Sequence, residues 1–230
     1  MKRQIRRFTF ETNSSSMHSL VITKNNERFT PDEILKDIYL FDDYEASEYS
    51  CIWQISDYHL DFGRSPFRPI FTFAEKWCYA CASLVNQYND STYKELVSIA
   101  MKYVPGLKKI ELSKRIKTIP IKKANSTLSS ESAMNGYEFM NYIDGLEDLY
   151  GEEINCWKND KDDWMYESYY TGSIDTYVLG SFLKRYNISL EEFLINKKYV
   201  VIQDGDEYYY WDEMKQTGLV NLGMIEEEYK

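Results

Sequence analysis

Apolar side chains recur along much of the chain with the 3.6-residue period of helices that are buried along one face. The segment 73–88 has the most regular pattern of this kind, and the segment 92–104 repeats it after a short polar break. Because helices joined by short connections tend to pack against each other, the two segments predict a helical hairpin in the middle of the chain.

Capping sequences mark where other helices begin. Thr30 is suited to the N-cap, Pro31 to the first helical position, and Glu33 to the return hydrogen bond of a capping box. A helix is therefore expected from here to about residue 40. Three more are expected, one from a second capping box at 189–192 and two over 136–150 and 174–186.

Alternating and β-branched segments predict strands at both ends of the chain. Segments 5–10 and 20–23 flank the polar turn 13–16 and predict an N-terminal β-hairpin. Segments 199–203 and 207–211 flank a short Asp-Gly turn and predict a C-terminal β-hairpin. Extended structure is also expected over 51–62 and 107–122.

These elements predict an α+β fold made of one domain with two lobes. The N-terminal lobe would span 1–124 and the C-terminal lobe 125–230, with the Ser/Thr-rich segment 125–132 at the boundary. An undivided single domain is the alternative.

Composition limits the class of protein. The apolar fraction of 43% is that of a folded chain, and no apolar run reaches the roughly eighteen residues that a membrane-spanning helix requires. No signal peptide is expected, and four cysteines are too few for a disulfide scaffold, so we expect a cytoplasmic protein. Cys78 and Cys81 lie on an apolar helix and are expected to be buried thiols. Neither a cofactor nor a metal site is predicted.

Charge is distributed unevenly. Residues 1–130 carry 19 Lys or Arg and 15 Asp or Glu, a balance of +4, whereas 131–230 carry 8 and 22, a balance of −14. Either the two parts attract each other, or they meet different partners, or both are ordinary solvated surfaces. The basic side chains that we expect to contact an anion or nucleic acid are Arg3, Arg6, Arg7, Lys114, Arg115 and Lys117.

The acidic part is also rich in tyrosine. Carboxylates interleaved with aromatic rings can imitate a nucleic-acid backbone with its bases, or anchor a protein interface. The candidate partner-binding residues are Glu147, Asp148, Glu152, Glu153, Asp160, Asp162, Asp163, Tyr166, Glu167, Tyr169 and Tyr170.

The segment 11–19 is unusually rich in hydrogen-bonding side chains. In an extended segment, Ser14, Ser16 and His18 would face the same side, which would allow an imidazole to activate a hydroxyl. Glu11 and Asn13 complete this candidate catalytic set. The same residues could bind a phosphate, or could form a structural turn held by local hydrogen bonds.

This segment also carries a resemblance. Residues 8–22 resemble the FETNSSS-x-HSL opening of a protein family of Firmicute bacteria and their phages, in which a basic arm precedes the motif as 2–7 does here. The segments 61–80 and 192–202 resemble two later blocks of that family more loosely. The resemblance implies a phage or mobile-element context and no particular activity.

Two hypotheses for function follow. In the first, the protein binds and inhibits a host protein, such as a nucleic-acid-binding component of a defence system, through its acidic, tyrosine-rich surface. In the second, it is a small enzyme that acts on a phosphate-bearing or nucleotide substrate at 11–19. A phage structural or assembly role is a third possibility.

Overall fold

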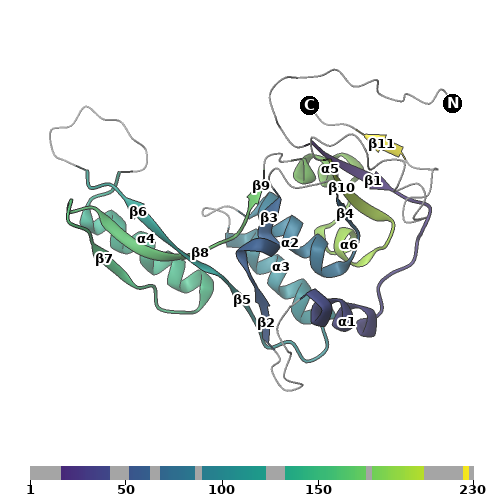
Figure 1. Cartoon of the computed structure of the whole chain (residues 1–230), viewed down its shortest axis with the longest axis horizontal. Coiled ribbons are helices and arrows are strands. Elements are labelled where there is room, and N and C mark those ends of the chain that lie inside the picture. The colour runs from purple at the N-terminus through teal and green to yellow at the C-terminus, as the bar shows by residue number, and fades with distance from the viewer. Residues whose placement is uncertain are drawn as a thin grey trace.

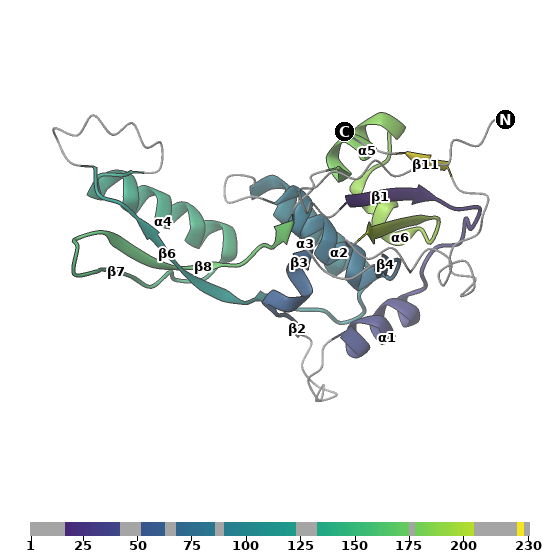
Figure 2. The same ribbon diagram turned by 45° about the horizontal axis from the view of Figure 1, so that its top comes forward.

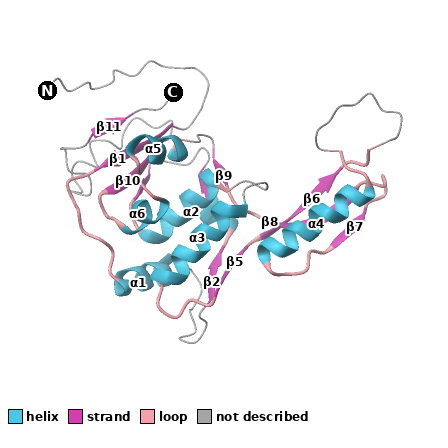
Figure 3. Cartoon of the chain, turned by 180° about the vertical axis from the view of Figure 1, so that it is seen from behind, coloured by secondary structure: helices cyan, strands magenta, loops and turns pink. Residues whose placement is uncertain are grey.

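A central helix, α2 (Phe73–Leu84), is enclosed by the other elements of the main lobe (Figure 1). The computed structural model describes residues 17–41, 52–62, 68–85, 90–122, 133–174, 178–204 and 225–227. Every residue of α2 from 76 to 83 is buried, so the helix has no solvent-facing side over two turns. Helix α3 (Asp90–Tyr103) runs beside it, which confirms the predicted helical hairpin (Figure 3).

Side-chain caps fix where the first helices begin. The Thr30 N–H donates to Glu33 Oε2 at 2.8 Å and the Glu33 N–H donates to Thr30 Oγ1 at 3.2 Å, so helix α1 (Pro31–Phe41) has the predicted capping box. From α1, the Asp37 carboxylate accepts the Ala74 N–H at 2.7 Å and caps the first turn of α2. One capping interaction therefore also joins two helices.

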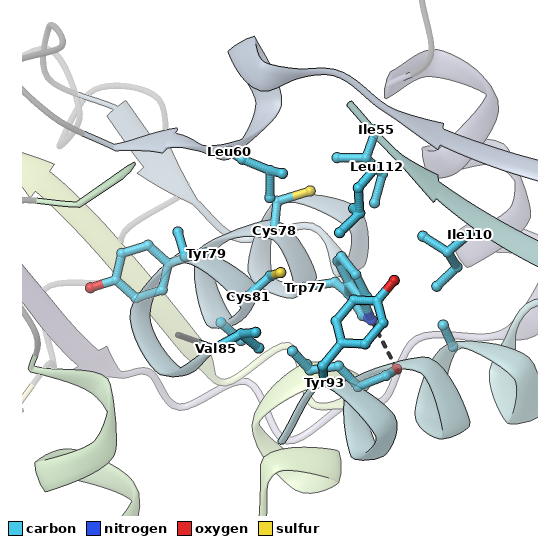
Figure 4. Close-up of a cluster of buried hydrophobic side chains, with 14 of the residues drawn as sticks. Ile55, Leu60, Trp77, Cys78, Tyr79, Cys81, Val85, Tyr93, Ile110 and Leu112 are labelled. Carbon is cyan, nitrogen blue, oxygen red and sulfur yellow. Dashed lines mark hydrogen bonds between the residues drawn. The ribbon is translucent and has the colours of Figure 1, made fainter. Parts of the chain in front are cut away.

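A parallel strand pair closes the core on the side of α3. Strands β2 (Ile52–Ile55) and β5 (Lys109–Leu112) pair from Ile52–Lys109 to Ile55–Leu112. Their inward side chains meet Trp77, whose indole N–H donates to the Leu96 carbonyl at 2.9 Å (Figure 4). The thiols of Cys78 and Cys81 lie in the same cluster, where burial raises the pKa of Cys81.

The main sheet joins segments from distant parts of the chain. Its strands follow the order β11–β1–β10–β4 and are all antiparallel: β1 (Met17–Ile22), β4 (Arg68–Ile70), β10 (Tyr199–Asp204) and β11 (Ile225–Glu227). Leu20 and Val21 point to opposite faces and are both buried, so the sheet is covered on both sides. Two short helices, α5 (Leu179–Tyr186) and α6 (Leu190–Ile195), pack against α2 beside this sheet.

Residues 114–122 and 133–169 form an arm that projects from the other described residues, which we call the main lobe (Figure 1). Strands β6 (Lys114–Ile119), β8 (Trp164–Tyr169) and β7 (Cys156–Lys158) form an antiparallel sheet in that order. Helix α4 (Gly136–Tyr150) covers one face of it (Figure 2). Phe139 of α4 stacks on Trp164 of β8, with ring centroids 4.6 Å apart.

Two segments of the chain connect the arm to the main lobe. One runs from β5 into β6, and the other runs from β8 into β9 (Ser173–Ile174), which pairs with β3 (Asp61–Phe62). A hydrogen bond from the Tyr170 N–H to the Ser113 carbonyl, at 2.8 Å, ties the two segments together. Gly172 follows with φ 126°, and a Cβ on it would lie 2.4 Å from the Ala82 Cβ on α2.

The α+β class is confirmed, as is the helix predicted over 136–150. Several local expectations differ from the structure. Residues 51–62 hold β2, a 3₁₀ helix (Asp57–Leu60) and β3 instead of one strand, and 174–186 begins with the end of β9 before α5. The box predicted at 189–192 is half formed, because Ser189 accepts the Glu192 N–H while the Glu192 carboxylate accepts from Asn196 and Arg28.

Strands β1 and β10 pair with each other and with strands from distant parts of the chain. Over Leu20–Ile22, β1 lies between β10 and β11, and over Val201–Gln203, β10 lies between β1 and β4. The predicted hairpin partners 5–10 and 207–211 lie outside the described residues. The main sheet thus combines strands from both sides of the division expected at 124/125, and the arm begins within β6, before that division.

Replacing Gly172 tests how closely the arm connection must approach α2. Gly172→Ala adds a methyl group that meets helix backbone and side chain, at a φ that L-residues rarely adopt. We expect the free energy of unfolding to fall by about 2–4 kcal/mol, measured by denaturant titration. Gly151→Ala is the control, since Gly151 has a positive φ but open space around it, so a smaller loss is expected. Equal losses would show that the close approach adds nothing.

Candidate functional site

The structure places His18, the one described member of the candidate catalytic set, in the core. It lies on β1 opposite Gln203 of β10, and only 4% of its surface is exposed. Its Nδ1 lies 3.2 Å from the Tyr79 hydroxyl on α2. Burial raises the pKa of Tyr79, so the phenol stays protonated over the physiological range.

The other members of that set, Glu11, Asn13, Ser14 and Ser16, lie outside the described residues. The placement of His18 corresponds to a core histidine, whose Nδ1 contact with Tyr79 ties the main sheet to α2. His59 also has a local role, since its Nδ1 accepts the Ser56 N–H at 3.3 Å and caps the 3₁₀ helix.

The candidate partner-binding tyrosines are not displayed on the surface. Tyr166, Tyr169 and Tyr170 are each at most 9% exposed. The Tyr166 hydroxyl lies 3.0 Å from that of Tyr142 on α4, and the Tyr169 ring packs on Tyr150 with centroids 4.1 Å apart. Tyr166 and Tyr169 therefore hold α4 on its sheet, and none of the three buried rings presents a large aromatic area to a partner.

Several candidate carboxylates also serve the fold. Glu152 accepts hydrogen bonds from Lys109 and Tyr169, and Lys114 lies 3.5 Å away. The hydrogen bond with Lys109, followed by that with Tyr169, lowers the pKa of Glu152 to about 2. Three more candidate carboxylates accept hydrogen bonds within the arm. Glu147 accepts from the Ile154 N–H, Asp163 from the Ile121 N–H, and Glu167 from the Asn155 side-chain amide.

Two of the basic candidates, Lys114 and Arg115, pair with carboxylates within the molecule. Arg115 donates two hydrogen bonds to one Asp57 oxygen, at 2.8 and 3.0 Å, and its guanidinium lies 3.6 Å from the centre of the Tyr170 ring. The hydrogen bond from Arg115 lowers the pKa of Asp57. Lys117 is exposed and pairs with no carboxylate in the described ranges. The remaining candidates Arg3, Arg6 and Arg7 lie outside those ranges.

Together these contacts hold the arm at its base. Glu152 binds Lys109 of the main lobe and Lys114 of the arm, while Arg115 of the arm binds Asp57 of the main lobe. Through Glu152, the acidic part of the chain thus pairs with Lys109 and Lys114 of the basic part at the arm connection. The pairs are partly exposed, so each contributes modestly, and their joint effect is to restrict the direction of the arm.

The exposed acidic residues are separated from the buried tyrosines. Asp148 lies on α4, Glu153 follows that helix, and Asp160 and Asp162 lie in the turn between β7 and β8. Asp162 is held locally, at φ 66° and 2.7 Å from Lys158. Of these residues only Asp148 stands in a regular row with other exposed side chains.

That row, which sequence analysis missed, runs along the outer face of α4. Tyr137, Asn141, Asp144 and Asp148 occupy positions i, i+4, i+7 and i+11, opposite the buried Phe139, Ile143 and Leu146. We call these four residues the α4 row. Tyr137 is 77% exposed, and the neighbouring Met140 is 43% exposed. The helical period of 136–150 contained this signal, because the polar face of a predicted helix follows from its apolar face.

Two large apolar side chains are exposed on the opposite face of the arm. By the strand register, Ile116 and Trp157 lie on the sheet face away from α4, and they are 61% and 39% exposed. The arm therefore has an acidic helix on one side. On the other side is a sheet face where Ile116 and Trp157 flank Glu167 of the central strand β8.

Comparison of the chain with models of protein families, with curated proteins and with solved structures gave no match. In the described part of the chain, no helix has the length and apolar character needed to span a bilayer. Within the same residues, no three His, Cys, Asp or Glu side chains group as metal ligands would. Function is therefore argued from the arm and from the core.

Removing the His18 imidazole tests whether that residue supports the core. His18→Ala leaves a cavity and removes the contact with Tyr79, so we expect a loss of about 2–4 kcal/mol in the free energy of unfolding. His59→Ala, which removes only a surface cap, should cost about 1 kcal/mol. Unchanged stability of His18→Ala would return the residue to the catalytic hypothesis.

The buried Lys76 predicts a pH dependence of stability. Its Nζ donates to the carbonyls of Phe193 and Asn196 at 2.8 and 2.9 Å, and Asp37 and Glu192 are the nearest opposing charges. Burial lowers the pKa of Lys76 from 10.5 to about 7. Between these values the unfolded chain binds a proton that the folded chain has released, so this lysine makes stability rise with pH.

Comparison with Lys76→Met isolates this contribution. The difference in free energy of unfolding between wild type and variant should be flat below pH 7. From pH 7 to 9 it should shift in favour of the wild type by up to about 1.4 kcal/mol per pH unit. Urea titrations at several pH values measure it, and a flat difference from pH 6 to 9 would contradict the lowered pKa.

Proposed function

We propose that this protein is an interaction protein whose arm presents the outer face of α4 to a positively charged, nucleic-acid-binding surface of another protein. The observation that carries the proposal is the α4 row, in which exposed carboxylates stand in line with an exposed tyrosine. The row contains Asp144 and Asp148, and α4 contains no Lys or Arg, so the charge of this face is complementary to a basic partner surface.

The sequence of α4 places negative charge where a helix alone would not favour it. The helix contains no Lys or Arg, and Glu147 and Asp148 lie in its last turn, next to the negative end of the helix dipole. Glu147 is used to hold Ile154, whereas Asp144 and Asp148 form no ion pair with the residues that the structure describes. Carboxylates near the C-terminal end of a helix are unfavourable, and Asp148 brings the fold no compensating ion pair among the described residues. We take this as support for a role in binding.

The arm is suited to presentation. It projects from the main lobe, and the contacts of Glu152 and Arg115 at its base limit its movement (Figure 3). A pre-oriented surface loses less conformational entropy when it binds, which favours affinity. The phage context that the resemblance at 8–22 implies is compatible with an inhibitor of a host nucleic-acid-binding protein.

The proposed interaction surface is the outer face of α4, whereas the sequence had suggested residues within 147–170. It retains the acidic and aromatic character of the first hypothesis, but it uses Tyr137 in place of the buried Tyr166, Tyr169 and Tyr170. The enzyme hypothesis receives no support from His18, whose imidazole is buried.

Charge reversal on the row tests the proposal. The tagged wild type, the double variant Asp144→Lys/Asp148→Lys and the control Asp32→Lys/Glu95→Lys are used to capture proteins from a bacterial lysate. The control changes two exposed main-lobe carboxylates and alters the net charge equally. We expect wild type and control to retain a basic partner that nucleic acid displaces, and the row variant to lose about tenfold or more of its affinity.

Thermal unfolding of all three proteins shows whether the variants fold. Since the four positions are exposed, melting temperatures should agree within a few degrees. Equal retention of the partner by the row variant would place the interaction surface elsewhere. Capture of nothing by the folded wild type would count against an interaction protein of this kind.

A further inference from the structure

The spacing of the α4 row suits contact with another helix. Residues at i, i+4, i+7 and i+11 alternate steps of four and three, which keeps them in one line along the helix. Lines of this kind form the seams along which two helices pack side by side. A compact binding site would need converging side chains, and the α4 row instead extends over three turns.

Gly145 is a second, independent feature of this face. Gly145 lies in the middle of α4 and is exposed. A Cβ added at this position would have no other atom within 4 Å. Its φ is not positive, so neither backbone conformation nor internal packing requires glycine. Glycine is among the poorest residues for a helix interior, yet here it leaves the backbone bare beside Asp144 and Asp148. A bare backbone allows another helix to approach closely.

We infer that the partner element bound by the α4 row is a basic α-helix, which packs along the row and approaches α4 most closely at Gly145. This inference rests on the proposed function, and it names the class of partner. Lys or Arg side chains of that helix would pair with Asp144 and Asp148. Another would lie on the exposed ring of Tyr137, where a cation–π contact is favourable.

Charge and shape together select this partner over others. Nucleic acid itself is disfavoured, because its phosphates would be repelled by Asp144 and Asp148. A flat basic surface would meet the carboxylates but would gain nothing from the missing side chain at 145. Basic helices are also the elements by which many proteins enter the major groove of DNA, which agrees with a nucleic-acid-binding partner.

Two synthetic peptides test the inference with the full-length protein. The first is a helical peptide of three heptads with Lys or Arg along one face and alanine elsewhere. The second has the same composition, with its basic residues spread around the helix. Binding is measured by fluorescence anisotropy at near-physiological salt, and helix formation by circular dichroism.

Gly145→Ala and Gly136→Ala form a matched pair of variants. Both change glycine to alanine in α4 at positions with open space, but Gly136 lies at the first residue of the helix. Gly145→Ala should raise the melting temperature by about 2–4 °C and weaken binding of the one-faced peptide by about tenfold. Gly136→Ala should leave that binding unchanged. Asp144→Asn/Asp148→Asn should weaken it further.

The outcomes separate the inference from the proposed function. Equal binding of both peptides, or unchanged binding by Gly145→Ala, would overturn the helix-specific inference and leave an acidic surface that binds basic proteins by charge. Absence of binding to either peptide would also overturn it, while the proposed function would still be judged by the lysate capture. Tighter binding of the one-faced peptide, lost only through Gly145 and the two aspartates, is the expected result.

Discussion

The structure depends on the burial of α2 in every direction. Polar groups on a helix with no solvent-facing side need partners inside the protein, because leaving a buried polar group unpaired costs free energy. Lys76 therefore donates to two carbonyls at the end of α6, and Tyr79 meets His18 of the main sheet. These polar contacts, together with the packing around Trp77, connect elements from both ends of the chain to one helix.

The same constraint determines how the arm is attached. The chain returns from the arm so close to α2 that only glycine fits at position 172. Arg115 with Asp57 and Glu152 with Lys109 then surround the connection, which is also held by backbone pairing between Ser113 and Tyr170. Much of the charge asymmetry along the sequence is thus used inside the molecule. Among the described residues, Asp144 and Asp148 on the outer face of α4 are exposed and take part in no such ion pair.

The tyrosine-rich acidic segment shows why side-chain roles are hard to assign from composition. Tyr166, Tyr169 and Tyr170 lie close to Glu167 in the sequence, a composition that fits either a displayed surface or a buried one. Helix α4 covers this sheet, so the rings of Tyr166 and Tyr169 are buried in the core. Their hydroxyls form hydrogen bonds with Tyr142 and Glu152. On α4 the exposed tyrosine is Tyr137, near the start of the helix. The polar face of this helix could be predicted from the sequence.

The sequence by itself determined the local elements. These are the capping box at Thr30 and Glu33, the helical hairpin of α2 and α3, and the limits of α4. They follow from the hydrophobic period and from capping, because both act within a few residues. Only the tertiary structure decided the partners of β1 and β10, the burial of His18, and the ion pairs at the base of the arm. These depend on contacts between residues far apart in the chain. Many alternative pairings satisfy the same local pattern, and the packing of the whole core selects among them.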